Sequence, residues 1–274
     1  MDQEPFVSII MSTRNRAQFI SRSILSALEQ SFKEWELLVM DDGSTDNTPE
    51  VMRAWEKKDV RIRYVRLTSP GNIAKASNAG LRMAKGEFVA ILDDDDWWID
   101  PEKLAKQIKF LREHPDYIAC GGSFIAVNGE GKETGRFGKP ETDEAIRRVM
   151  LSANAIANST SMFRRVESGF YDESLTGFAD WDFFLRLGTI GKLYNFLDYF
   201  LAYRMWGGAG SVMSQRKNVD AALVIVPRYR NDYPGFIKGI LLARLHWLYS
   251  RLPMPIRRAT HSFLSRLKKS LFSQ

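Results

Sequence analysis

The chain is poor in the residues that build disulfide scaffolds and histidine metal centres. Among its 274 residues there is one cysteine, Cys120, and there are three histidines, which lie far apart: His114, His246 and His261. A single cysteine excludes a disulfide framework and a cysteine-rich zinc site. The sequence also lacks a run of the roughly 20 apolar residues that a membrane-spanning helix requires, and its acidic start does not resemble a secretory signal. We therefore expect a cytoplasmic protein.

The basic residues are concentrated at one end of the chain. Residues 216–274 contain 12 Lys and Arg but only two Asp, which gives a net charge of +10, whereas residues 1–215 carry a net charge of −4. A hydrophobic content of 45% provides enough apolar side chains for a folded core. We therefore predict a globular domain over 1–215 and a basic, amphipathic helical tail over 216–274.

Strand and helix patterns alternate through the first 115 residues. Apolar runs of strand length are followed by segments with apolar residues at helical spacing, and Thr48-Pro49 and Asp100-Pro101 each pair a capping residue with a first-turn proline. The predicted strands are 6–11, 35–40, 61–67 and 87–92, and the predicted helices are 17–30, 48–58, 73–85 and 101–113. This alternation predicts an α/β fold with a mainly parallel sheet covered by helices on both faces.

The second half is less regular. The turn Asn128-Gly129 predicts a hairpin. Further elements are predicted as helices over 141–151 and 180–187 and as strands over 159–163 and 193–196. No repeat or low-complexity linker separates this half from the first, so we expect one compact body.

Three polar clusters follow predicted strands. They are Thr13-Arg14-Asn15-Arg16, Asp41-Asp42-Gly43-Ser44 and Asp93-Asp94-Asp95-Asp96. Because the carboxyl ends of parallel strands meet at one edge of a sheet and ligands bind there, we expect these clusters to lie close together. Lys75 and Asn78, near the start of a predicted helix, can face the same cleft.

The acidic run Asp93–Asp96 is the strongest of these signals. Consecutive carboxylates repel one another, and Mg²⁺ or Mn²⁺, which binds carboxylate and phosphate oxygens, relieves that repulsion. A solvated turn that caps the next helix is the alternative, but two tryptophans, Trp97 and Trp98, are unusual in such a turn. Asp41 and Asp42 can accept hydrogen bonds from a nucleobase or ribose, or can hold a turn, and nearby arginines can donate to phosphate.

These motifs, in this order and spacing, resemble those of the family 2 inverting glycosyltransferases with the GT-A fold. The resemblance covers roughly residues 5–207. It is carried by the segments 7–16, 36–46, 80–88, 91–96, 169–173 and 180–182.

The resemblance implies a nucleotide-diphospho-sugar transferase-like fold, with a nucleotide-binding half up to about residue 115 and an acceptor half over 116–215. It implies a nucleotide-sugar donor, with uridine as the expected base, and a Mn²⁺ or Mg²⁺ cofactor that neutralises the diphosphate leaving group. Together with the residue patterns it gives these donor-site candidates: Thr13, Arg14, Asn15, Arg16, Asp41, Asp42, Lys75, Asn78, Asp93, Asp94 and Arg204. The metal candidates are Asp93, Asp95 and Asp96, and the choice between Asp95 and Asp96 stays open.

The family's catalytic base lies in a Glu-Asp pair, and the matching residues here are Ala179 and Asp180. Asp180 is therefore the candidate base, with Asp182 as second choice. A base at this position would deprotonate the acceptor hydroxyl as it attacks the anomeric carbon with inversion. The expected reaction is metal-dependent sugar transfer to a glycan or lipid-linked glycan, in the synthesis of a bacterial-type surface polysaccharide, lipopolysaccharide or glycolipid.

The tail suggests a membrane partner. Over 236–274 apolar residues recur at helical spacing beside Lys and Arg, and no acid follows Asp232, a pattern typical of helices that lie on anionic membrane surfaces. We expect peripheral attachment at the inner face of the cell membrane and no nucleic-acid partner. A helix docked on the domain and a dimer interface are the alternatives, and the oligomeric state stays open.

Two other functions remain alternatives at this point. The first is a non-catalytic, membrane-associated module that binds nucleotide-sugars, and Ala179 in place of Glu is the feature that favours it. The second is a sugar nucleotidyltransferase. That class usually carries a Gly-rich basic loop after the first strand, which Ser12–Arg16 does not match.

Overall fold

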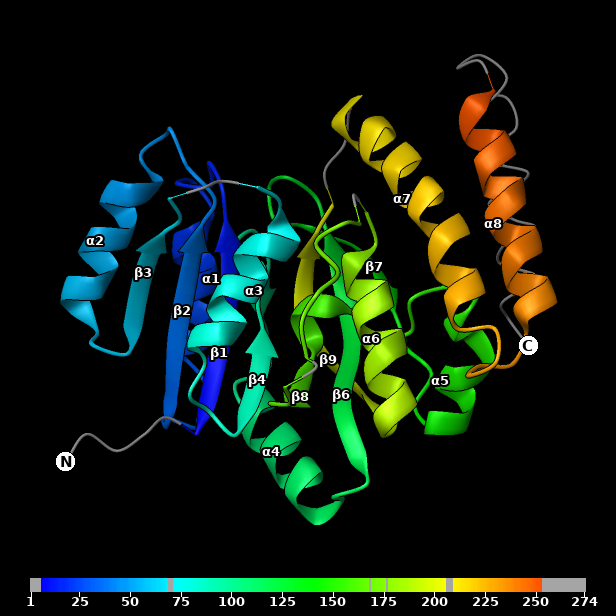
Figure 1. The fold of residues 1–274 in the computed structure, drawn as a ribbon. Helices are drawn as coiled ribbons and strands as arrows, with labels where there is room; N and C mark the ends of the chain where they lie inside the picture. The colour runs from blue at the N-terminus through cyan, green and yellow to red at the C-terminus, as the bar shows by residue number, and fades with distance from the viewer. Residues whose placement is uncertain (1–5, 69–70, 168, 176, 206–208, 253–274) are drawn as a thin grey trace.

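The computed structural model of the chain describes residues 6–68, 71–167, 169–175, 177–205 and 209–252. A mixed sheet lies in the middle of these residues, with helices on both of its faces (Figure 1). The strands are β1 (Val7–Thr13), β2 (Trp35–Asp41), β3 (Ile62–Arg66), β4 (Phe88–Ile91), β5 (Trp97–Trp98), β6 (Tyr117–Val127), β7 (Glu133–Phe137), β8 (Met162–Arg164) and β9 (Lys192–Arg204). The helices are α1 (Ile20–Leu28), α2 (Thr48–Lys58), α3 (Ile73–Met83), α4 (Lys103–Glu113), α5 (Asp143–Met150), the 3₁₀ helix η1 (Asn158–Thr160), α6 (Ala179–Ile190), α7 (Ala209–Arg228) and α8 (Phe236–Arg251).

The sheet has two parts that differ in strand direction. Its order is β3-β2-β1-β4-β8-β6-β9-β5, with β7 paired to β6. The first four strands in this order are mutually parallel, so the carboxyl ends of β1, β2 and β4 meet at one edge. β8 is antiparallel to both of its neighbours, whereas β6 and β9 are parallel to each other. The predicted α/β fold with a mainly parallel sheet is confirmed, and the antiparallel strands β5, β7 and β8 make the sheet mixed.

The apolar residues of each central strand alternate between two core layers. On β1, Val7, Ile9 and Met11 pack with residues of α1, α2 and α4, whereas Ile10 packs on the other face with α3, α5, α6 and α7. Such a strand is buried on both faces and therefore reads as a continuous apolar run in the sequence. Figure 1 shows α3 and α6 together in front of the sheet.

The second half differs from its prediction at two strands. The strand predicted over 159–163 is the 3₁₀ helix η1 followed by β8, because Thr160 Oγ1 donates to the carbonyl of Ala157 at 2.7 Å and closes a turn there. The strand predicted over 193–196 is the first part of the longer β9. Its pairing with β6 shifts register on both sides of Ser123, which interrupts the two-residue alternation that marks a strand in the sequence.

The predicted boundary after residue 215 falls inside α7. The later part of α7 packs against the core through Ala221, Ala222, Ile225 and Val226. The remainder of the predicted tail, residues 253–274, lies outside the described residues. Within the described part of the chain, none of the helices combines the length and apolar character needed to cross a bilayer.

A buried lysine in α4 supports a prediction about stability. The Lys103 side chain is fully buried, and its Nζ donates to Gln107 Oε1 at 2.7 Å. Burial lowers the pKa of Lys103 to about 7, so between this value and its ordinary pKa the unfolded chain binds an extra proton. The unfolding free energy of the wild type should therefore rise, relative to Lys103→Met, by about 1.4 kcal/mol per pH unit between roughly pH 7.5 and 9.5. Urea unfolding of both proteins across this range tests it, and a constant difference would contradict it.

Candidate active site

β1 and β2 place the first two polar clusters side by side. Their parallel register pairs Thr13 with Asp41, and the backbone N–H of Asp42 donates to the carbonyl of Thr13 at 2.9 Å. Asn15 then links the two loops that follow. It has a φ of 56°, which asparagine tolerates better than most residues, and its Oδ1 accepts from the backbone N–H of Thr45 at 2.7 Å. The two clusters therefore form one connected surface.

The two neighbouring aspartates after β2 have different environments. Asp41 is fully buried, and its Oδ1 accepts from the backbone N–H of Ser44 at 2.8 Å and from the Ser44 hydroxyl at 2.6 Å. The Tyr64 hydroxyl donates to its other oxygen. Asp41 therefore holds the turn. Asp42 is also buried, and its Oδ1 accepts from the backbone N–H of Gly71 at 2.7 Å. Its Oδ2 lies 3.5 Å from the guanidinium of Arg14, whose side chain is mostly exposed and therefore accessible to a ligand.

Arg16 joins the acidic run to this surface. Its Nε lies 3.6 Å from Asp94 Oδ1 and 3.8 Å from Asp95 Oδ2, and its backbone N–H donates to Thr48 Oγ1 at 3.0 Å. The structure thus brings together the clusters that follow β1, β2 and β4, as the parallel topology predicts.

The acidic run after β4 is packed into the protein. Asp93 Oδ2 accepts from Ser159 Oγ at 2.7 Å. Burial raises the pKa of Asp93 to about 6 and that of Asp94 to about 7, and the charge of Asp95 adds to both shifts. Asp96 is also buried, and burial together with the charge of Asp93 raises its pKa well above the ordinary value. These groups hold negative charge close together at a high electrostatic cost.

A divalent cation fits this arrangement. Among the described residues, Asp96 Oδ2 is a buried oxygen without a hydrogen-bond partner. The side chain of Asp95 is 17% exposed, compared with 11% for that of Asp94, so a cation in the cleft can reach Asp95 more easily. The described part of the chain contains no ready-made group of three or more metal-binding side chains. One or two carboxylates suffice for Mg²⁺ when substrate phosphates and water supply the other ligands.

A cavity of about 640 Å³ lies beside the acidic run. Its lining includes Asp93 together with Asp180 of α6, and also residues of α3, β6, η1 and β9. The two carboxylates are 87 positions apart in the sequence and line the same space. The cavity therefore joins the half that carries the polar clusters to the less regular second half.

Asp180 is oriented by Asn154, which Lys139 contacts in turn. The amide Nδ2 of Asn154 donates to Asp180 Oδ2 at 2.9 Å, and Lys139 Nζ donates to the backbone carbonyl of Asn154 at 3.0 Å. Burial raises the pKa of Asp180, while hydrogen bonds and the charge of Lys139 lower it. All three residues line the cavity. Asp180 is thus a half-buried carboxylate with proton affinity above that of an ordinary aspartate.

Asp182 does not share this position. Two residues along a helix correspond to a rotation of about 200°, so Asp182 faces away from the side that Asp180 presents to the cavity. It is buried, and its Oδ1 accepts from the hydroxyl of Tyr229 at 3.0 Å and from Arg228 Nη1 at 3.2 Å. Asp182 is absent from the cavity lining. The second-choice base is therefore placed against α7 and the segment that follows it.

Three other predicted donor-site residues have structural contacts. Asn78 is buried, with its Oδ1 accepting from the N–H of Tyr171 at 2.7 Å and its Nδ2 donating to the carbonyl of Tyr171 at 2.9 Å, so it fastens α3 to the 171 segment. Arg204 Nε donates to the backbone carbonyl of Asp95 at 3.1 Å, and this hydrogen bond holds the backbone of the acidic run in place. Lys75 is half-buried in the first turn of α3, beside Gly71.

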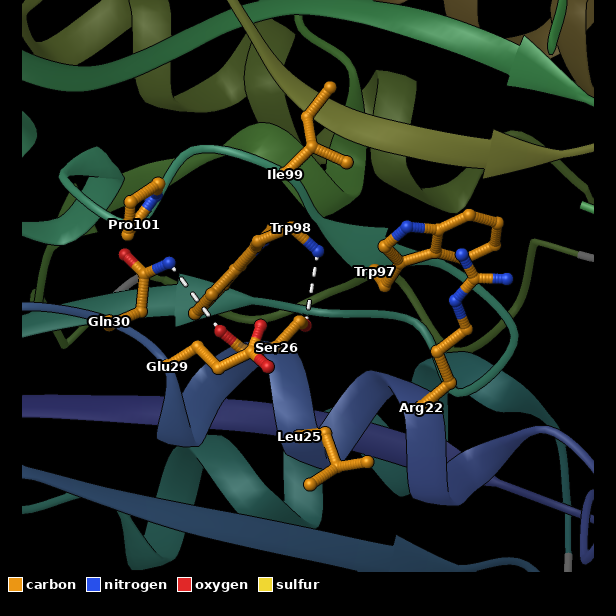
Figure 2. A pocket seen from close by; sticks show the side chains of 9 residues that line it. All are labelled: Arg22, Leu25, Ser26, Glu29, Gln30, Trp97, Trp98, Ile99 and Pro101. Carbon is orange, nitrogen blue, oxygen red and sulfur yellow. Dashed lines mark hydrogen bonds between the residues drawn. The ribbon is translucent and has the colours of Figure 1, made fainter.

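The acidic run is also held from the side of α1. Figure 2 shows a second pocket, of about 610 Å³, in which the backbone N–H of Trp98 donates to Ser26 Oγ at 3.1 Å. In the same view the guanidinium of Arg22 stacks on the indole of Trp97, 3.3 Å from the ring centroid. None of residues 93–96 lines this pocket. These contacts of Trp97 and Trp98 fix the position of the backbone directly after the four aspartates.

Sequence reasoning missed the residues that hold the two key carboxylates. Asn158 and Ser159 of η1 bind Asp93, and Lys139 and Asn154 lie beside Asp180. These residues belong to η1 or to loops with no periodic pattern. The polar residues Asn154, Asn158, Ser159 and Thr160, in or just before a predicted strand, were the signal that the sequence offered.

Solved glycosyltransferase structures share this fold. The structure of Staphylococcus aureus TarS residues 1–349 in complex with UDP-GlcNAc superposes with a TM-score of 0.69 at 20% identity, over 89% of this chain and 72% of that one. The mannosyltransferase PcManGT from Pyrobaculum calidifontis, in complex with GDP-Man and Mn²⁺, gives a TM-score of 0.66 at 19% identity, over 97% of this chain and 81% of that one. The fold class is therefore that of the GT-A glycosyltransferases.

The sequence matches the model of the family described as glycosyl transferase family 2 over residues 8–167, and the chain belongs to this family. The putative teichuronic acid biosynthesis glycosyltransferase TuaG of Bacillus subtilis is 39% identical over 46% of this chain and 48% of its own length. The hyaluronan synthase of Pasteurella multocida is 33% identical over 70% of this chain and 20% of its own length. The chain thus spans about half or less of the length of these curated relatives.

The contact between Lys139 and Asn154 supports a prediction about pH dependence. If Asp180 must be ionised for activity, the rate falls as pH drops through the pKa of Asp180. Replacing Lys139 with Met removes a positive charge that lowers this pKa, so the acidic limb of the pH–rate profile should move to higher pH. Lys139→Arg, which keeps the charge, should leave the limb in place. An unchanged limb in Lys139→Met, measured as kcat against pH, would contradict the role of this ammonium.

Proposed function

We propose that the chain transfers a sugar from a nucleotide-sugar, with UDP as the expected nucleotide, to a hydroxyl group of a glycan or lipid-linked glycan. The observation that carries the proposal is the shared cavity lined by Asp93, beside the polar strand ends, and by Asp180 in the second half. A transferase needs such an arrangement because donor and acceptor must meet at the anomeric carbon.

In the proposed donor site, Asp42 and Arg14 contact the nucleoside, and Thr13, Arg16 and Asp94 line the nucleotide pocket. Asn15, Asp41 and Asn78 act through their hydrogen bonds, which hold the loops in place. Asp95, with Asp93 and Asp96 beside it, would hold Mn²⁺ or Mg²⁺. A bound cation supplies a positive charge that neutralises the diphosphate leaving group.

In the proposed reaction, Asp180 accepts the proton of the acceptor hydroxyl. The hydroxyl oxygen forms a bond to the anomeric carbon while the bond from that carbon to the diphosphate oxygen breaks, and the nucleoside diphosphate leaves with the electron pair. Attack from the face opposite the leaving group inverts the anomeric configuration. Asn154 keeps the carboxylate pointed into the cavity through its 2.9 Å hydrogen bond.

We place this reaction in the synthesis of a bacterial-type surface polysaccharide, lipopolysaccharide or glycolipid, in the cytoplasm at the inner face of the membrane. The relatives named above, a putative teichuronic acid biosynthesis glycosyltransferase and a hyaluronan synthase, support polysaccharide synthesis as the setting.

The test is product analysis with a panel of UDP- and GDP-sugars, Mn²⁺ and a set of glycan acceptors. We expect release of a nucleoside diphosphate, an acceptor heavier by one glycosyl unit and, by NMR, an anomeric configuration opposite to that of the donor. Release of pyrophosphate would point to a nucleotidyltransferase instead. Donor binding without release of diphosphate would support a non-catalytic binding module.

A further inference from the structure

Helix α8 carries an apolar stripe on its outer face. Its members are Ile237, Leu241, Leu245, Leu248 and, directly after the helix, Leu252, each between 39% and 73% exposed. Their spacing of three or four residues places them within an arc of about 80° on a helix with 100° per residue. A stripe of large apolar side chains exposed in one row is uncommon on a soluble surface and marks an interaction site.

The opposite face of α8 attaches the helix to the domain. Gly239, Ala243 and Ser250 are buried there. A Cβ added at Gly239 would lie 2.4 Å from the carbonyl oxygen of Leu151, so the glycine allows this close approach. Figure 1 shows α8 as the outermost helix, beside α7 and away from the sheet. The apolar stripe therefore points away from the part of the chain that holds the helix in place.

The charges around the stripe identify its partner. Lys238 and Arg244 flank it on either side of the helix surface. Arg251, at the end of the helix, pairs with Asp220 of α7 at 3.5 Å. The sequence contains no acidic residue after Asp232. A second copy packed stripe to stripe would bring the cations of one copy close to the cations of the other. The following segment, 253–274, has five Lys and Arg and no acid, so it is not complementary either.

We propose that the outer face of α8 docks on an anionic lipid surface, with the apolar stripe entering the boundary between headgroups and acyl chains and Lys238 and Arg244 contacting lipid phosphates. This inference goes beyond the proposed reaction and does not depend on it, because it rests on α8 alone. It assigns the membrane contact to one helical face, which sits on the side of the domain formed by α7 and α8.

The test is co-sedimentation of the full chain with vesicles of phosphatidylcholine, either alone or with about one third phosphatidylglycerol. The stripe variant is Leu241→Gln/Leu245→Gln/Leu248→Gln, since glutamine retains helix propensity. The matched control is Val60→Gln/Ile190→Gln/Leu197→Gln, which removes three exposed apolar side chains elsewhere on the surface. Circular dichroism and thermal unfolding verify that both variants fold.

We expect the wild type and the control to bind the phosphatidylglycerol vesicles and the stripe variant to bind at least about tenfold more weakly. Lys238→Gln/Arg244→Gln should weaken binding to these vesicles and reduce its dependence on salt. The proposal is overturned if the wild type does not bind, or if the stripe variant binds as well as the control. Conversion of a dimer to a monomer by the stripe variant, with vesicle binding retained, would assign the face to a second copy of the chain.

Discussion

Replacing Asp180 with Asn is expected to lower kcat for sugar transfer by about 10³-fold, the usual contribution of a general base, while the affinity for the nucleotide-sugar changes little. The substitution keeps the size of the side chain but removes its ability to accept a proton. Asp180 is half-buried in the cavity wall, and burial raises its pKa. Its carboxylate therefore binds the proton of the acceptor hydroxyl more strongly than an ordinary aspartate would. Steady-state kinetics with a saturating donor, together with donor binding by calorimetry, would separate the two effects.

Asp182 provides the matched control for this prediction. It lies on the same helix, but its carboxylate contacts Arg228 and Tyr229 and not the cavity. Asp182→Asn should reduce thermal stability and leave kcat per folded molecule within a few fold of the wild type. Equal losses of kcat in the two variants, or full activity in Asp180→Asn, would remove Asp180 from its proposed role.

Replacing Asp95 with Ala is expected to lower the transfer rate by at least about 10²-fold at fixed Mn²⁺, because it removes a partly exposed carboxylate proposed to hold the cation. The Mn²⁺ concentration that gives half the maximal rate should rise as well. A rate titration with Mn²⁺ in wild type and variant measures both quantities. Removal of divalent cations from the wild type with a chelator should have an effect of similar size.

The control for Asp95 is Asp116, an exposed aspartate just before β6 that pairs with Lys192 at 2.7 Å. β6 runs in the same direction as β1 and β4, so Asp116 lies at the opposite edge of the sheet from the proposed donor site. Asp116→Ala removes the same charge and should leave the Mn²⁺ titration unchanged. A normal titration curve in Asp95→Ala would contradict the metal assignment.

The first half of the fold was predictable because its strands are buried on both faces. Runs such as Ile9–Met11 and Leu37–Met40 cannot be solvent-facing strands, and helical segments with capping signals follow them. The second half was predicted only in part. The register shifts around Ser123 and the Ser- and Thr-rich turn of η1 depend on tertiary contacts that leave no periodic pattern in the sequence.

For the candidate site, the sequence predicted the meeting of the three polar clusters because parallel topology alone dictates it. The sequence did not show that Asp41 holds a turn whereas Asp42 lies beside Arg14. The two neighbouring aspartates differ only in the direction of their side chains, which the sequence does not reveal. The choice between Asp180 and Asp182 likewise required the orientation of α6 relative to the cavity. Lys139 and Asn154 are positioned by tertiary packing, and the contacts of Asn154 with Lys139 and with Asp180 follow from it.

We propose that polar residues at the ends of β1, β2 and β4 together bind a nucleotide-sugar with a divalent cation. Thermal unfolding of the chain with each nucleotide-sugar, with and without Mn²⁺, measures this binding. At a donor concentration of 100 times Kd, the folded state gains about 2.7 kcal/mol, and the melting temperature should rise accordingly. We expect this rise for at least one donor, only with the cation, and its loss in both Asp42→Ala and Asp95→Ala. No shift with any donor, or a full shift in both variants, would contradict it.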